Sequence, residues 1–232
     1  MDQNSDFLSS SREGDKMNNI ENYTIRNEQA KDYWNVEDLT RKAFWNLNVP
    51  GCSEHYMVHV MRNHPDFIPE LDLVLEKDNR IIGNIMYTKA KLIDEENREK
   101  QILTFGPLSV HPEFQRKGYG KVLLEYSFAK AKEMSYDVIV IFGNPDNYVS
   151  RGFKSCKKFD ICVREGIYPA AMMVKELTEG CLDKRKWRYV ESEVYEVDKI
   201  AAEQFDTNFE KMEKKFQPCQ EEFYIHSHSR II

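Results

Sequence analysis

Hydrophobic residues in the first part of the chain recur at spacings typical of one short strand and two helices. After a polar stretch of 20 residues, positions 23–28 alternate between polar and apolar residues, which predicts a strand. Apolar side chains at intervals of three and four predict an amphipathic helix over residues 31–47. A second helix is predicted over residues 53–64, because Pro65 disfavours helical geometry in the residue before it.

The middle of the chain changes to strand patterns. Residues 71–78 and 80–93 predict a β-hairpin, because two apolar runs flank a short polar turn. Residues 102–110 form a further apolar run that contains Gly106 and Pro107. Gly and Pro inside a strand mark a bulge or the end of regular pairing, so we expect an irregularity at this point.

A helix and a fully buried strand follow this run. Residues 121–135 have helical periodicity, and residues 137–143 are a continuous β-branched run typical of a strand buried on both faces. A helix between two strands makes them parallel, by a right-handed crossover. Residues 156–163 and 170–177 predict two more strands. The outer strands are expected to be antiparallel, so the predicted fold class is α/β with a mixed sheet flanked by helices.

Composition divides the chain into three parts. Residues 1–20 are polar, with a run of three serines, and predict a flexible N-terminal arm. Residues 21–180 carry the strong strand and helix patterns and are predicted to form one domain. Residues 181–232 have only partial helical periodicity, which predicts a helical or mixed C-terminal extension.

Charge and composition exclude several classes of protein. Hydrophobic residues make up 41% of the 232 positions, which is enough for a packed core. The net charge of −6 argues against a nucleic-acid binder and mildly suits a cationic substrate. No segment approaches the roughly 18 apolar residues of a membrane span, and the N-terminus lacks the pattern of a secretory signal. The five cysteines are scattered without a Cys-x-x-Cys pair, so the sequence indicates neither a zinc site nor a disulfide framework, and a reducing cytoplasm fits best.

One polar segment, Gln115–Gly120, has the features of a phosphate-binding turn. It lies between a predicted strand and a predicted helix, where Gly118 and Gly120 let the backbone approach a ligand closely. The helix start leaves amide groups free and carries the positive end of the helix dipole. A phosphate or pyrophosphate could be held there, with Arg116 and Lys117 as additional cationic donors.

Two common nucleotide-binding motifs do not fit this segment. A Walker loop would need Gly at position 115 and Ser or Thr at position 122, where Gln115 and Val122 stand. A dinucleotide fingerprint would need a small residue at the position of Leu123. A nucleoside triphosphate site is therefore rejected, and a dinucleotide site is disfavoured.

The segment and its surroundings resemble a known family. Residues 109–124, SVHPEFQRKGYGKVLL, look like the coenzyme A signature of the GNAT superfamily of N-acetyltransferases, Q/R-x-x-G-x-G/A after a strand ending V-x-P. Residues 138–143 resemble the next strand of that family, and residues 147–153 resemble its Y-x-x-x-G-F segment. The resemblance covers roughly residues 23–177 and points to a poorly characterised bacterial branch.

The resemblance implies a splayed pair of parallel strands in the centre of the sheet, with the pantetheine arm of acetyl-CoA between them. The strand backbone would bond this arm, and the turn amides would hold the pyrophosphate. Lys121 has a second interpretation as a solvated helix residue, and Asn144 has one as a turn cap. The implied acetyl-CoA contacts are Leu108, Ser109, Val110, Gln115, Arg116, Lys117, Gly118, Tyr119, Gly120, Lys121 and Asn144.

Chemistry and the resemblance together suggest catalytic roles. An amine with a pKa near ~10 must lose a proton before it can attack a thioester. Tyr148 occupies the family's position for the acid that protonates the leaving thiolate, and the Val110 amide would stabilise the oxyanion. Glu70 is a speculative base beside Asp72, although a helix cap or a solvated turn is the simpler explanation for either residue. His111 could relay a proton, or it could be a plain turn residue.

Other aromatic and histidine residues have ordinary interpretations as well. Six such residues in the two predicted N-terminal helices are expected to pack there or lie on the helix surface, although the tryptophans and the tyrosine could line an acceptor pocket. They are Trp34, Trp45, Tyr56, His55, His59 and His64.

The implied function is transfer of an acetyl group from acetyl-CoA, as a co-substrate and without a metal, to a primary amine in a ternary complex. The acceptor is expected to be a small molecule or a peptide, and polyamines, aminoglycosides, amino acids and protein N-termini all remain open. Dimers are common in the family, which leaves a homodimer open. The alternative is a non-catalytic CoA-binding or regulatory module, because a fold alone does not establish activity.

Overall fold

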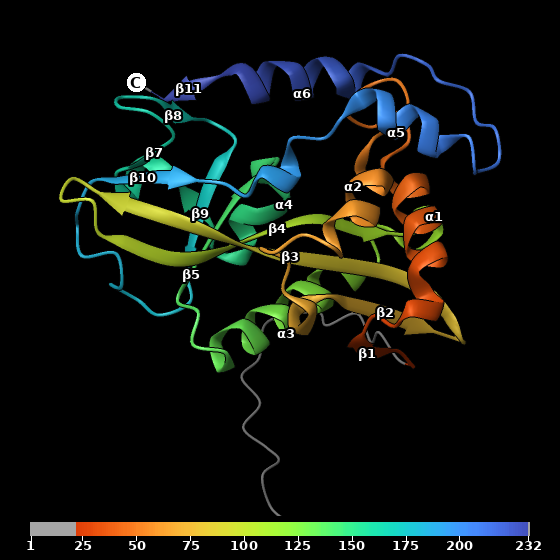
Figure 1. The fold of residues 1–232 in the computed structure, drawn as a ribbon, viewed down its shortest axis with the longest axis horizontal. Helices are drawn as coiled ribbons and strands as arrows, with labels where there is room; N and C mark the ends of the chain where they lie inside the picture. Colours follow the sequence, from red (N-terminus) through yellow and green to blue (C-terminus); the bar gives the residue numbers. More distant parts are fainter. Residues whose placement is uncertain (1–21, 232) are drawn as a thin grey trace, which may run out of the picture.

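A long antiparallel hairpin forms the centre of the structure, a computed structural model that describes residues 22–231 (Figure 1). Its strands are β3 (Arg80–Asp94) and β4 (Glu99–Val110), which pair along most of their length. Most of their side chains are buried, because helices cover both faces of the sheet. The arm expected over residues 1–20 lies outside the described residues.

The other strands extend this hairpin into a mixed sheet. They are β1 (Thr24–Asn27), β2 (Leu73–Lys77), β5 (Val138–Phe142), β6 (Lys154–Ser155), β7 (Ile161–Cys162), β9 (Met172–Glu176) and β10 (Trp187–Val190). The order is β1-β2-β3-β4-β5-β9-β6, while β10 pairs with β3 and β7. A separate ribbon joins β8 (Tyr168–Pro169) to β11 (Arg230–Ile231). The predicted α/β class with a mixed sheet is confirmed.

The helices divide between the two faces of the sheet (Figure 1). They are α1 (Tyr33–Phe44), α2 (Glu54–Met61), α3 (Tyr119–Glu133), α4 (Pro145–Tyr148), α5 (Lys199–Asp206) and α6 (Pro218–His228). Short 3₁₀ turns are η1 (Ala30–Asp32), η2 (Pro69–Leu71), η3 (Pro112–Phe114), η4 (Val149–Arg151), η5 (Cys156–Phe159) and η6 (Glu193–Tyr195). Helices α1 and α2 pack Val36 and Val58 onto Met86 of β3. Helix α3 packs Leu123 and Phe128 into a separate cluster.

The predicted strand over residues 156–163 is shorter than expected. Residues 156–159 form the turn η5, because the Ser155 hydroxyl accepts a hydrogen bond from the Lys157 amide and caps the turn. Asp160, with a φ of 51°, then ends the turn in the left-handed region. Only the two residues of β7 remain in the sheet.

The parallel pair at the centre separates along its length. Strands β4 and β5 pair at a single register position, Leu103 with Ile139. Strand β5 instead continues along β9 as far as Phe142, while β4 continues along β3 as far as Val110. The predicted splay is thus confirmed, and one edge of β4 is left open beyond this pairing.

The segment after residue 180 joins the same sheet through β10 and then crosses to the other end of the molecule. Helix α5 lies against α2, and its Asp206 Oδ1 accepts a hydrogen bond from Arg41 Nε of the neighbouring α1 at 2.6 Å. Helix α6 is largely exposed and runs along the upper edge in Figure 1 towards β11. The segment from α5 through α6 to β11 therefore connects the α1–α2 end of the fold with the end that contains β8.

Candidate active site

The turn between β4 and α3 presents a row of free backbone amides. The first helical bond of α3 runs from the Val122 amide to the Gly118 carbonyl at 3.1 Å. The amides of residues 116–121 donate to no group in the part of the chain that the structure describes. Because the 15-residue helix adds its positive dipole end, this turn is well suited to an anion such as a diphosphate.

Two left-handed residues give the turn its shape. Arg116 has a φ of 58° and Gly118 has a φ of 93°. Glycine adopts the second conformation without the steric penalty of a Cβ. Gly120 differs, because a Cβ built there would lie 3.6 Å from Val110 Cγ2, an ordinary contact. The turn therefore requires glycine at position 118 for its backbone angle, whereas position 120 has room for a methyl group.

Three cations surround the row of amides. Arg116, Lys117 and Lys121 are all exposed. Lys121 Nζ lies 3.8 Å from Glu125 Oε1, the distance of a weak surface pair. The Gln115 side chain turns back towards the strand, since its Nε2 donates to the Val110 carbonyl at 3.0 Å. Gln115 thus links the turn to the open edge of β4.

Along β4, the backbone N–H and C=O groups of successive residues point alternately towards β3 and towards the open edge. The His111 amide donates to the Ile82 carbonyl of β3 at 2.9 Å. Because these groups alternate along a strand, Ser109 also directs its backbone to β3, whereas Leu108 and Val110 direct theirs to the open edge. The Ser109 hydroxyl donates to Thr40 Oγ1 at 2.9 Å. Two of the three predicted strand contacts are therefore available to a ligand.

A bulge lies beside this edge. Ile85 of β3 is opposite Leu108, but Tyr87 is opposite Phe105, so β4 carries one extra residue between them. The extra residue falls at Gly106 and Pro107, where the sequence predicted an irregularity. The bulge and the departure of β5 together leave backbone groups of β4 without a strand partner.

Tyr148 lies at the end of α4, packed under this opening. Its ring centroid is 5.8 Å from that of Phe105 and 5.8 Å from that of Phe153. A Cβ built on Gly143 would lie only 2.7 Å from the Tyr148 ring, so Gly143 makes room for it. Burial raises the pKa of Tyr148 to about 12, which keeps the phenol protonated at neutral pH.

Asn144 caps α4 directly. Its side-chain oxygen accepts a hydrogen bond from the Asp146 amide at 3.0 Å. The capping interpretation is therefore seen in the structure, and a contact with pantetheine stays a prediction.

The acidic candidates lie at a different place. Glu70 is exposed in η2. Burial and, after it, the Glu70 charge raise the pKa of Tyr136, which follows α3. Asp72 is buried and accepts a hydrogen bond from Asn84 Nδ2 at 3.1 Å. Burial, assisted by the nearby Glu28 carboxylate, raises the pKa of Asp72. The structure does not bring Glu70 next to the bulge or to Tyr148, and its role as a base stays a prediction.

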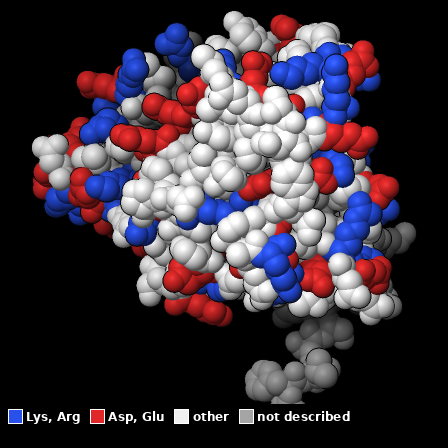
Figure 2. Space-filling view, turned by 45° about the vertical axis from the view of Figure 1, so that its right-hand side comes forward, with Lys and Arg blue, Asp and Glu red and all other residues white. Residues whose placement is uncertain are grey.

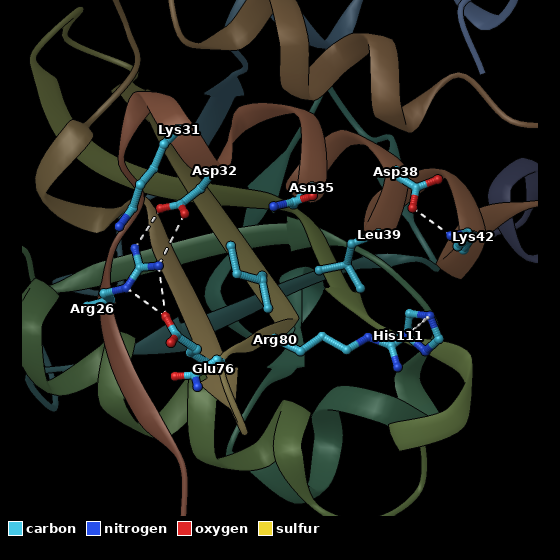
Figure 3. A pocket seen from close by; sticks show the side chains of 12 residues that line it. Arg26, Lys31, Asp32, Asn35, Asp38, Leu39, Lys42, Glu76, Arg80 and His111 are labelled. Atoms are coloured by element: carbon cyan, nitrogen blue, oxygen red, sulfur yellow. Dashed lines mark hydrogen bonds and ion pairs between the residues drawn. The ribbon is translucent and has the colours of Figure 1, made fainter. Parts of the chain in front are cut away.

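His111 lies at the rim of a separate pocket of about 450 Å³ (Figure 3). Its Nε2 is 2.6 Å from Arg80 Nη2, and burial together with this guanidinium lowers its pKa. Charges in the pocket are largely paired with one another, as Arg26 is with Asp32 in Figure 3. The lining residues include none of the predicted acetyl-CoA contacts.

The helix aromatics and histidines pack against the C-terminal segment. Trp34 stacks on Phe209 at 4.4 Å between centroids, and His59 lies 4.5 Å from Phe205. His55 Nε2 is 3.1 Å from Asp206 Oδ1. Trp45, through Nε1, donates to the Glu213 carbonyl at 2.9 Å, and Tyr56 contacts Phe205. Their partners lie more than 140 positions away, so no local pattern could have indicated them.

Sequence reasoning missed three residues around the separating strands β4 and β5, namely Tyr189, Glu191 and Tyr195. The Tyr195 hydroxyl donates to the Gly106 carbonyl at 3.4 Å. The Tyr189 hydroxyl donates to Glu191 Oε1 at 3.4 Å. All three belong to the segment after residue 180, whose hydrophobic pattern shows only partial helical periodicity.

The surface and the side-chain inventory add little further chemistry. In Figure 2, Lys and Arg alternate with Asp and Glu around a central uncharged area. Within residues 22–231, no group of three or more His, Cys, Asp or Glu side chains is arranged to hold a metal ion. None of the helices in this part of the chain has the length and apolar composition needed to cross a membrane.

Comparisons with known proteins agree with this geometry. A GNAT family N-acetyltransferase (YhbS) from Escherichia coli, solved in complex with CoA, is 21% identical with a TM-score of 0.65, over 76% of this chain and 93% of that chain. A GNAT family acetyltransferase from Brucella melitensis, solved in complex with acetyl-CoA, is 20% identical with a TM-score of 0.60, over 75% of this chain and 97% of that chain. At these identities the likeness concerns the fold. No curated protein matches the chain.

The decisive comparison is with a family model. The acetyltransferase (GNAT) family model matches residues 24–155, which is more than half of the chain and includes the turn, the bulge and Tyr148. The chain therefore belongs to the acetyltransferase (GNAT) family.

Proposed function

We propose that this protein transfers an acetyl group from acetyl-CoA to a primary amine, by direct attack of the amine in a ternary complex. The observation that carries the proposal is the row of free amides at residues 116–121 next to the open edge of β4. The two similar structures contain CoA and acetyl-CoA, which supports the same donor for this chain.

Donor binding would use the turn and the strand together. The amides of residues 116–121 would hold the diphosphate, and Arg116 and Lys117 would add charge. Leu108 and Val110 would bond the pantetheine arm through the open edge of β4, as an added strand does. This arrangement would place the thioester beside the bulge, with the Val110 amide directed at the oxyanion that forms on the carbonyl oxygen.

The reaction would then need one proton removed and one supplied. The amine nitrogen attacks the thioester carbon once it has lost a proton, and the C–S bond of the tetrahedral intermediate breaks. The departing sulfur would take its proton from Tyr148, whose raised pKa of about 12 keeps that proton available. The Tyr148 ring position under the opening supports this role.

The acceptor is proposed to be a primary amine on a small molecule or peptide. All five cysteines are free, which fits action in a reducing compartment such as the cytoplasm. The alternative, a CoA-binding module without activity, shares the donor site and differs only in turnover.

Calorimetry and thiol release test the proposal together. We expect purified protein to bind acetyl-CoA and CoA and to bind neither ATP nor NAD at comparable concentrations. Release of free CoA thiol should depend on an added amine. Binding without any amine-dependent thiol release would favour the non-catalytic module, and absence of binding would refute both.

A further inference from the structure

We propose that Glu191, supplied by the C-terminal segment, is the proton acceptor for the amine and that the amine arrives as an ammonium ion. This inference rests on the acetyl transfer proposed above. It is carried by the positions of two tyrosines of this segment: Tyr195 packs on the bulge of β4, and Tyr189 lies beside the end of β5.

The C-terminal segment reaches the bulge by following β3. Strand β10 pairs with β3 as far as Val190 opposite Lys91 and then leaves the sheet. The chain continues as η6, which brings Tyr195 over the neighbouring residues of β3 and β4. The Tyr195 hydroxyl accepts a hydrogen bond from Thr88 Oγ1 at 3.4 Å and donates to the Gly106 carbonyl at 3.4 Å. A Cβ built on Gly106 would lie 3.5 Å from the Tyr195 ring, so this ring packs directly on the bulge.

Glu191 is linked to both of the strands that separate. The Tyr189 hydroxyl donates to Glu191 Oε1 at 3.4 Å, and the Tyr189 ring is 5.9 Å from that of Phe142, the last residue of β5. The negative charge of Glu191 also acts on Tyr195, which contacts the bulge of β4. Tyr189 therefore connects Glu191 to the end of β5, and Tyr195 lies within reach of the Glu191 charge while it contacts β4.

The carboxylate is available to a cation. Glu191 is exposed to solvent, and within residues 22–231 it forms no ion pair with Lys, Arg or His. In contrast, Glu37 is paired with Arg62, and Asp206 is paired with Arg41. An accessible carboxylate without a cationic partner, next to aromatic rings, is suited to an incoming ammonium group.

The surroundings tune this carboxylate for proton transfer. Although Glu191 is an exposed residue, packing around its carboxylate removes part of the hydration and raises its pKa to about 7; the Tyr189 hydrogen bond opposes this rise, and the Glu196 charge adds to it. After burial, the Glu191 charge helps to raise the pKa of Tyr195, and the Oγ of Ser192, the residue after Glu191, lies 3.4 Å from His64 Nδ1. A base whose pKa is close to the working pH is the most effective general base, because it is both deprotonated and able to hold a proton.

The proton balance is simple. The ammonium N–H gives its proton to the Glu191 carboxylate, and the freed nitrogen pair forms the N–C bond at the thioester carbon. The C–S bond breaks, the thiolate takes a proton from Tyr148, and the second amine proton restores Tyr148 through solvent. Glu191 releases its proton to water, so the net reaction gives an amide, CoA thiol and one proton.

The test compares Glu191→Gln with wild-type protein and with Glu179→Gln, which removes an exposed carboxylate in the turn after β9. Acetyl transfer to phenethylamine, spermidine and alanylglycine is measured by thiol release from pH 6 to 10. We expect Glu191→Gln to bind acetyl-CoA as wild type does, but to lose about 10²-fold or more of kcat/KM at pH 7.5. Glu179→Gln should keep the wild-type rate.

The pH profile separates a proton acceptor from a structural role. Wild-type kcat/KM should rise with an apparent pKa of about 7, and Glu191→Gln should lose this rise and instead gain rate towards pH 10, where the amine is neutral without help. An unchanged profile in Glu191→Gln, or loss of the rise in Glu70→Gln instead, would overturn the inference while leaving acetyl transfer intact. A wild-type protein that does not bind acetyl-CoA would refute the proposed function itself.

A second measurement decides the matter if none of the three amines is a substrate. Carbon NMR of protein labelled at the Glu carboxyl groups gives the Glu191 titration directly, with Glu191→Gln assigning the signal. A midpoint near pH 7 in the CoA complex, shifted downwards by bound phenethylamine, supports the proposal. An ordinary midpoint near ~4.3, or no response to the amine, overturns it.

Discussion

Two glycines that are two residues apart provide the sharpest test of the turn geometry. Gly118 has a φ of 93° and a ψ of −8°, so a Cβ at this position meets the following carbonyl group. Gly118→Ala should destabilise the fold by about 1–2 kcal/mol, the usual penalty of a left-handed residue other than glycine. For a chain of this size that corresponds to a fall in Tm of about 2–8 °C.

Gly120→Ala is the matched control with the opposite expected sign. Its Cβ would make only an ordinary contact of 3.6 Å with Val110 Cγ2. Because the position is helical, replacing glycine by alanine should raise stability by up to about 1 kcal/mol. The same one-carbon change is therefore expected to lower Tm at position 118 and to preserve or raise it at position 120.

Thermal unfolding by circular dichroism and calorimetry with acetyl-CoA measure both consequences. If the substituted turn relaxes away from its left-handed angle, its amides no longer converge, and Gly118→Ala also loses affinity for acetyl-CoA. Gly120→Ala should keep the wild-type affinity within about threefold. Equal Tm changes in the two variants, or a rise in Gly118→Ala, would refute the reasoning.

Three further predictions concern stability and catalysis. Asp206→Asn should cost about 3 kcal/mol in urea unfolding, because it leaves the buried Arg41 guanidinium without its carboxylate, whereas Asp38→Asn on the surface should cost less than about 1 kcal/mol. Tyr148→Phe should lower kcat about 10²-fold while the calorimetric Kd for acetyl-CoA stays unchanged; an unchanged kcat would remove the acid role. Because the pKa of Asp72 is raised in the folded state, that state keeps a proton which the unfolded state releases above pH ~4, and the free energy of unfolding therefore falls as pH rises. Between pH 5 and 8, the Tm of Asp72→Asn should consequently fall less than that of the wild type.

The central part of the fold could be predicted because its signals are local. The turn at residues 115–120 is determined by glycines and by its place before a helix, and the irregularity in β4 is determined by Gly106 and Pro107. Strand β5 was visible as a β-branched run. Each of these features depends on neighbours within about ten residues, which is the range that periodicity and turn chemistry report.

The C-terminal contribution could not be predicted in the same way. Arg41 and Asp206 form an ion pair across 165 positions, and Trp34 stacks on Phe209 at a similar separation. Such contacts come from tertiary packing, for which one sequence carries no local pattern. Glu191 shares this difficulty, because its relation to the bulge arises only after β10 has paired with β3.

The free amides of residues 116–121 are the part of the structure on which donor binding depends, and amide NMR observes them directly. In a titration of ¹⁵N-labelled protein with CoA, we expect the largest shifts at residues 116–121, followed by those at Leu108 and Val110. Shifts concentrated instead on the pocket that contains Arg80 and His111, or no shifts with saturating CoA, would contradict the account.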